Sequence, residues 1–121
     1  MKYIIDLIED VREQIENSEA YELRAGLLKE DENDSSKLIY AGEAPLNVVT
    51  LNQDEKELKF KIDGSGKRVT VGAFIPSLLI LDMDSMMYVL KMDVNAEYKD
   101  MEIVGFGKND EQKSYILFIK I

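Results

Sequence analysis

The sequence predicts an α+β fold in which one N-terminal amphipathic helix packs on a curled, mainly antiparallel sheet of about seven or eight strands. Three observations predict this class. Residues 2–19 carry a helical apolar repeat, the apolar period changes to two from Ala20, and turn-forming clusters then separate a series of short alternating runs. A sheet of that size is normally twisted or curled around its helix. We expect the 121 residues to form a single globular domain, 1–121.

The predicted helix, residues 2–19, has one apolar and one acidic arc when its side chains are placed about 100° apart. The apolar arc consists of Ile4, Leu7, Ile8, Val11 and Ile15, and Ile5 lies off to one side. The opposite arc consists of Asp6, Glu9, Glu13 and Glu16. Arg12 is the only base in this segment after Lys2. The acidic arc is therefore largely unpaired within its own helix.

The middle of the chain reads as an antiparallel meander. Residues 21–27 alternate as a half-buried strand does, and residues 30–36, "EDENDSS", predict a loop. Three short strands follow, with the sequences "KLIYA", "LNVVTL" and "LKFKI", separated by "GEAP" and "NQDEKE". Turn chemistry then predicts that "DGSG" joins "LKFKI" to "KRVTVGAF" in a β-hairpin.

The last third of the chain predicts further strands after one ambiguous segment. Residues 75–82 remain open between helix and strand, because a short apolar run has no decisive period and Pro76 suits a first helical turn or a strand edge. Beyond Asp84, alternation through Tyr88 and Met92 favours a strand. The runs "MEIVGFG" and "SYILFIKI" predict a closing hairpin.

Composition argues against an enzyme. The chain has no cysteine and no histidine, so it lacks thiolate nucleophiles, disulfides, the commonest general base near neutral pH and the commonest transition-metal ligand. We therefore expect no catalytic residues, no metal site and no cofactor. Apolar runs are too short for a transmembrane helix or a secretory signal, and we expect a cytoplasmic protein.

The net charge of −9 is concentrated near the amino end. Residues 1–34 hold 11 acidic and 4 basic side chains, whereas residues 35–121 are nearly balanced. A field of this sign repels phosphates, which argues against nucleic-acid and membrane partners. It favours a protein partner with a basic surface.

Two aspartates at the end of the apolar run "LLILDMDS" invite a metal-dependent interpretation. The run locally resembles the Asp-x-Asp motif of haloacid-dehalogenase phosphatases, in which the two carboxylates take part in phosphoryl transfer. That family places the motif near its amino terminus in an alternating β/α domain, whereas Asp82 and Asp84 follow a meander. We interpret them as the end of one element and the start of another, made through side-chain to backbone hydrogen bonds.

Two features are candidates for a partner-binding surface. Five of the six methionines fall within residues 83–101, and flexible thioethers suit irregular partners, although core filling explains such residues equally well. The acidic arc could receive a basic patch, although it also suits a solvated helix face. The candidate partner-binding residues are Asp6, Glu9, Glu13, Glu16, Met86 and Met87.

We therefore expect a small, acidic, non-enzymatic protein-binding domain, such as an adaptor. In composition and element order it is similar to dedicated secretion chaperones and toxin-immunity proteins, although secretion chaperones usually end in a helix. An edge strand such as "YILFIKI" would favour a homodimer.

Two other functions remain open. One is a carboxylate-based, metal-dependent hydrolase using Asp82 and Asp84, with Asp93 as a further ligand. The other is a carrier that holds a small apolar ligand between helix and sheet, lined by Ile8, Val11, Tyr88 and Met92. The lysines of the middle hairpin, Lys56, Lys59, Lys61 and Lys67, are interpreted as protection of a strand edge against aggregation.

Overall fold

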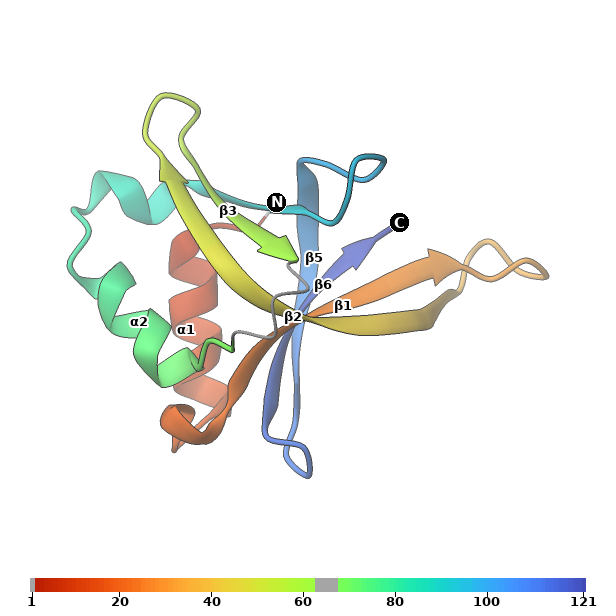
Figure 1. The fold of residues 1–121 in the computed structure, drawn as a ribbon, viewed down its shortest axis with the longest axis horizontal. Coiled ribbons are helices and arrows are strands. Elements are labelled where there is room, and N and C mark those ends of the chain that lie inside the picture. Colours follow the sequence, from red (N-terminus) through yellow and green to blue (C-terminus); the bar gives the residue numbers. More distant parts are fainter. Residues whose placement is uncertain (1, 63–67) are drawn as a thin grey trace.

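The computed structural model describes residues 2–62 and 68–121, and within them six strands close into a barrel in chain order. The strands are β1 (Glu22–Glu30), β2 (Leu38–Asn52), β3 (Glu57–Ile62), β4 (Val89–Asp93), β5 (Met101–Asn109) and β6 (Ser114–Lys120). The helices are α1 (Ile4–Gln14) and α2 (Val71–Leu79), with the short 3₁₀ helices η1 (Ser18–Ala20) and η2 (Asp84–Met87). Both α-helices lie on one side of the barrel (Figure 1). None of the described helices is both long and apolar enough to span a bilayer.

The predicted α+β class with a curled, mainly antiparallel sheet is confirmed. Four of the strand contacts are antiparallel, while β1 with β6 and β3 with β4 are parallel. β2 joins two runs that the sequence separates at "GEAP", so counting its halves separately gives seven runs. The strand passes this break through an irregularity opposite Leu27 and Leu28, where Gly42 adopts a φ of 153°.

The apolar arc of α1 is confirmed, because its five side chains are at most 8% exposed. The helix is shorter than predicted. It ends at Gln14, and Ile15 takes extended backbone angles, φ −130° and ψ 121°, while keeping its side chain buried. This turn directs the chain toward η1 and β1. At the other end the Asp6 carboxylate accepts a hydrogen bond from the Tyr3 backbone N–H at 2.8 Å, which stabilises the first turn.

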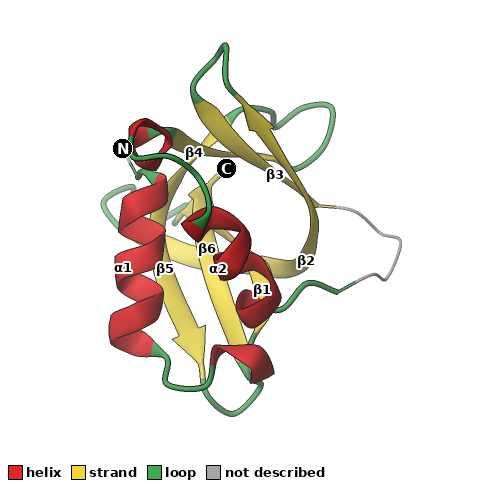
Figure 2. Cartoon of the chain, turned by 90° about the vertical axis from the view of Figure 1, so that its left-hand side faces the viewer, coloured by secondary structure: helices red, strands yellow, loops and turns green. Residues whose placement is uncertain are grey.

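The start of the chain forms part of the barrel wall. Leu90 N–H donates to the Lys2 carbonyl at 2.9 Å, and Ile4 N–H donates to the Tyr88 carbonyl at 3.1 Å. This short pairing occupies the first half of β4, and β5 pairs with the second half through Lys91 and Met92. One edge of β4 is thus shared between the amino end and β5, and Figure 2 shows α1 running beside β5.

The predicted hairpin between "LKFKI" and "KRVTVGAF" is wrong. β3 pairs with β2 and β4, and the predicted turn "DGSG" lies in residues 63–66, outside the described ranges. Of the described part of that run, residues 69–71 add to the sheet. They pair with the start of β1, through Leu23 N–H to the Val69 carbonyl at 2.8 Å and Val71 N–H to the Tyr21 carbonyl at 2.9 Å.

The rest of the run "KRVTVGAF" forms α2 (Val71–Leu79). This helix also includes the first part of residues 75–82, the segment for which helix and strand both remain open in the sequence. The Thr70 hydroxyl accepts from Ala73 N–H at 3.2 Å and caps the helix. Pro76 lies inside α2 and has no N–H for the preceding turn, which suits a helix of only nine residues. The segment is a helix and not a strand because this conformation buries Phe74, Ile75 and Leu78 against the barrel.

Two predictions about strand edges are also wrong. β6, the run "YILFIKI", pairs with β1 on one side and β5 on the other, so it offers no edge for a second copy. β3 likewise has neighbours on both sides, so its lysines do not protect an edge. The closing hairpin of β5 and β6 and the strand predicted beyond Asp84 are confirmed.

Two glycines of the sheet provide a matched test of packing on the barrel wall. A Cβ atom at Gly26 would lie 2.6 Å from the Phe118 ring and 2.7 Å from Ile116, whereas one at Gly105 would have no atom within 4 Å. Gly26→Ala should therefore lower the free energy of unfolding by about 1–3 kcal/mol. Gly105→Ala should change it by less than about 0.5 kcal/mol. Urea denaturation of both variants checks this, and equal losses would contradict the packing of Phe118.

Candidate functional site

Asp82 lies shortly before η2 (Asp84–Met87). Its carboxylate accepts hydrogen bonds from the Ser85 backbone N–H at 3.0 Å and the Ser85 hydroxyl at 2.8 Å. These bonds favour the ionised form and lower the pKa of Asp82 below its usual value. Ser85 is buried, which fixes the turn that the two residues make. The predicted side-chain to backbone hydrogen bond is confirmed for Asp82, and Asp84 is the exposed first residue of η2.

The residues of the two alternative functions lie apart from one another. Across residues 2–62 and 68–121, no three acidic side chains converge as a metal site would require. Asp93 stands at the far end of β4 from Asp82, where it accepts a hydrogen bond from Asp100 N–H at 2.9 Å. Of the expected carrier lining, Val11 and Met92 are buried in the core and Tyr88 is half-buried. Ile8 is buried too, and it lines a surface groove described below.

The four residues of the predicted acidic arc have different environments, and Glu16 lies beyond the end of α1. Asp6 is half-buried and engaged at the helix start, while Glu9 is exposed. Glu13 and Glu16 line a polar surface hollow together with Lys108 and Lys113 of the β5–β6 hairpin. Lys108 also donates to the Gln14 carbonyl at 2.9 Å. The C-terminal part of the acidic arc therefore faces basic side chains of the same chain.

The methionines divide between the core and the surface. Met92 is fully buried, and Met101 is half-buried against the core. In contrast, Met83 and Met87 are 85% and 58% exposed, and Met86 is half-buried. Core filling thus explains one end of the methionine run and not the other.

The surface methionines belong to a groove of about 400 Å³ between α1 and the chain that leads from α2 to β4. We call it the methionine groove. It is lined by Ile5, Ile8, Arg12, Leu79, Leu81, Met83, Met86 and Met87. Leu81 also lines a second, smaller apolar hollow against Phe74 and Leu78, so the apolar surface continues along α2. Met86 and Met87, two of the predicted partner-binding residues, are therefore together in one site.

Other residues of this site were missed from the sequence. Leu79 lines the groove and is 47% exposed, and the next residue in the chain, Ile80, is 85% exposed. The sequence does not predict this exposure, because residues 75–82 have no decisive apolar period. Ile5 carried the one usable signal. It is the apolar residue outside the core arc of α1, and such a residue faces something other than the core.

A comparison with models of known protein families, with curated proteins and with solved structures finds no match for this chain.

The two hydrogen bonds that the Asp82 carboxylate accepts from Ser85 predict a pH-dependent contribution to stability. Because its pKa is lowered in the folded state, its carboxylate stabilises the fold above the unfolded pKa of about 3.9 and loses this effect as pH falls through the folded value. Asp82→Asn should lower the free energy of unfolding near neutral pH, and its difference from the natural chain should shrink below about pH 4. Urea denaturation across this pH range measures both.

Two further variants make this test specific. Ser85→Ala removes one of the two donors to Asp82 and should give a smaller loss. Asp84→Asn, at the exposed position two residues later, should change stability near neutral pH by less than about 0.5 kcal/mol. A loss for Asp82→Asn that does not vary with pH would contradict the role given to its charge. If Mg²⁺ raised the melting temperature only while Asp82 was intact, the hydrolase alternative would gain support instead.

Proposed function

We propose that this chain is a protein-binding module whose docking surface is the methionine groove. The observation that carries the proposal is the exposure of large apolar side chains that line the groove: Met83 at 85%, Met87 at 58% and Leu79 at 47%. Isolated exposed apolar residues are common, but a contiguous set around a groove marks an interaction surface. Methionine side chains adapt to irregular partners at little cost in strain, which suits such a surface.

The chemistry of the groove favours an amphipathic segment with basic residues beside its apolar face. Acidic side chains flank the apolar lining, since Glu9 follows Ile8 on α1 and exposed Asp82 and Asp84 bracket Met83. Among the described residues, Arg12 is the one base that lines the groove. The net charge of −9 adds a long-range field of the same sign. A helix with an apolar face and basic flanks would match both the apolar lining and the charge.

The shape of the groove also suits a helical occupant. One wall is the straight helix α1, which contributes Ile5, Ile8 and Arg12 from successive turns. The opposite wall is the bend from Leu79 to Met87, held by the Asp82 cap. A side chain docked between the walls would contact apolar atoms on both sides. This arrangement is the helix-in-groove mode of recognition, in which anchors spaced by one turn supply most of the affinity.

A synthetic amphipathic helix of leucine and lysine tests the proposal, with a leucine and glutamate helix as its counterpart. The lysine peptide should bind with a Kd on the order of micromolar in isothermal titration calorimetry, and the glutamate peptide should bind at least about tenfold more weakly. Leu79→Lys should lower the affinity for the lysine peptide about tenfold or more, because it places a charge in the apolar lining. Glu9→Lys should lower it by a smaller factor, because it removes part of the charge match.

Leu38→Lys is the matched control. Leu38 is 47% exposed, the same fraction as Leu79, and it begins β2 in the β1–β2 hairpin that projects away from the helices in Figure 1. This variant should keep the affinity of the natural chain. Equal binding of the two peptides would remove the charge argument. An equal effect of Leu38→Lys and Leu79→Lys would remove the groove as the binding site.

A further inference from the structure

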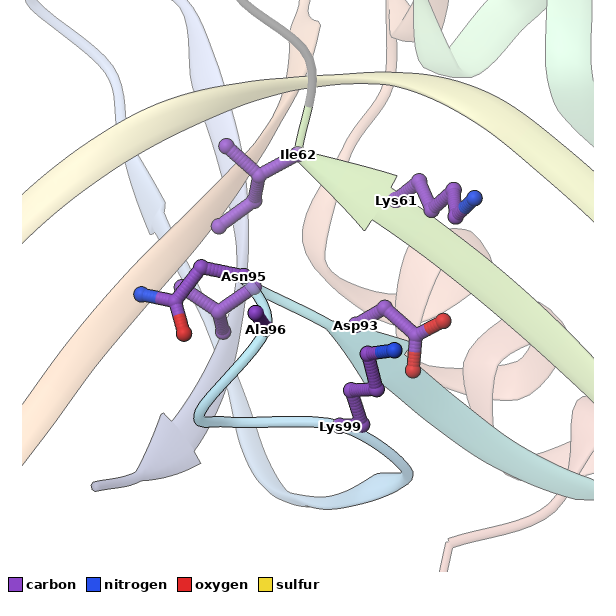
Figure 3. Close-up of a pocket in the computed structure, with 7 residues that line it drawn as sticks. Lys61, Ile62, Asp93, Asn95, Ala96 and Lys99 are labelled. Carbon is purple, nitrogen blue, oxygen red and sulfur yellow. The ribbon is translucent and has the colours of Figure 1, made fainter.

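A separate hollow, of about 530 Å³, opens where β3 and β4 end and the β4–β5 connection begins. It is lined by Lys61, Ile62, Asp93, Val94, Asn95, Ala96 and Lys99. Figure 3 shows that Ile62 and Asn95 approach each other on one side, and that Asp93 and Lys99 lie together on the other. We call this site the basic hollow. Its volume is in the range of sites that hold small molecules.

Two lysines and one aspartate line the basic hollow, and two further lysines lie nearby on β3 and β4. On the outer faces of β3 and β4, Lys59 lies directly opposite Lys91 in the sheet register, and Lys61 lies opposite Asp93. Two like charges on facing positions destabilise a sheet unless other groups offset them. The edge-protection role predicted for the β3 lysines is excluded because β3 is an inner strand. Protection of a strand edge therefore does not explain why Lys59 and Lys61 occur on β3.

The nearby carboxylates are directed to one lysine, Lys59. It forms an ion pair with Asp100, and its Nζ lies 3.7 Å from a carboxylate oxygen of Glu57 and 3.7 Å from one of Asp93. The pKa of Lys59 is raised, first by the hydrogen bond to Asp100, as expected for a cation surrounded by acids. Among the ion pairs of the described residues, neither Lys61 nor Lys99 has a partner. Both line the basic hollow.

The rest of the lining provides two further kinds of contact. Ile62, Val94 and Ala96 supply apolar surface, and the exposed Asn95 supplies an amide NH2 group that can donate. The Asn95 side-chain oxygen accepts from the backbone N–H groups of Glu97 and Tyr98, at 2.9 Å each. These bonds fix the loop that carries Ala96 and Lys99. Hydrogen bonds within the chain thus hold this side of the hollow in shape.

We infer that the basic hollow binds a small organic anion, one with a carboxylate or phosphate group and a compact apolar body. The anionic group would lie between the ammonium groups of Lys61 and Lys99, and the apolar body would contact Ile62, Val94 and Ala96. Asp93 opposes a dense polyanion, because its own charge is in the same lining. The site therefore fits a single anionic group joined to an apolar body better than it fits a nucleic-acid backbone.

The test is a titration of the ¹⁵N-labelled full chain, followed by two-dimensional amide NMR, with phenyl phosphate, inorganic phosphate and benzyl alcohol as probes. Phenyl phosphate should shift the amide resonances of Asn95, Ala96 and Lys99 saturably, with a Kd on the order of millimolar. Benzyl alcohol and inorganic phosphate should each bind at least about tenfold more weakly, because each provides only one of the two contacts. No saturable shift of these resonances by about 10 mM phenyl phosphate would overturn the inference.

Two double variants separate a site from general charge attraction. Lys61→Gln with Lys99→Gln should weaken phenyl phosphate binding about tenfold or more. Lys29→Gln with Lys37→Gln removes the same charge from two exposed lysines of the β1–β2 hairpin, and should leave the Kd within about twofold. The NMR spectra show directly whether each variant remains folded. Equal weakening by both pairs, or shifts spread over unrelated lysines, would mean that the hollow is not a binding site.

Discussion

The fold depends on how one edge of β4 is shared. Its first half pairs with the amino end of the chain, through the Lys2 carbonyl and Ile4 N–H, and its second half pairs with β5. Because α1 begins at Ile4, directly after this pairing, its apolar arc is positioned over the barrel from its first residue. The Tyr115 hydroxyl then donates to the Asp10 carboxylate at 2.6 Å, which ties the helix to β6. Burial and this hydrogen bond raise the pKa of Tyr115, so the phenol stays a donor throughout the neutral range. Within the described ladder, β4 and β5 are joined by two residue pairs. The pairing with the amino end therefore completes this edge of β4.

Local pattern was sufficient to predict the elements whose burial depends on one face. The apolar arc of α1 and the alternation of β4 are visible in the sequence, because each buries one face against the same core. The partners of the strands were not visible. Parallel pairing of β1 with β6 and of β3 with β4 joins residues far apart in the chain, and a hairpin is the simpler assumption from sequence alone. The strand predicted for the run "KRVTVGAF", residues 67–74, is wrong for a related reason. Its first residues do pair in a sheet, with β1, and packing of Phe74 and Leu78 then converts the rest to α2.

The candidate site was predictable only in part, since exposure is a tertiary property. Met87 and Met92 are five residues apart in one methionine-rich run, yet the first is 58% exposed and the second is fully buried. Their difference in exposure arises because Met87 lies in η2, where it lines the groove, whereas Met92 is an inward residue of β4. The acidic arc shows the same limit. Its periodicity was read correctly, but the lysines that share a hollow with Glu13 and Glu16 come from the β5–β6 hairpin, about ninety residues later in the chain.

The methionine groove and the basic hollow stand at opposite ends of one short strand. Met87 immediately precedes Tyr88 and β4, and Asp93 ends it, so the two sites are separated by roughly 15–20 Å of extended chain. The inward side chains of this strand, Leu90 and Met92, are fully buried and hold it in the core. A strand fixed in this way transmits no large displacement from one end to the other. The two sites should therefore bind their occupants independently, the groove through apolar area and the hollow through two ammonium groups. Any coupling between them would have to act through the shared edge of β4, where the amino end of the chain and β5 meet.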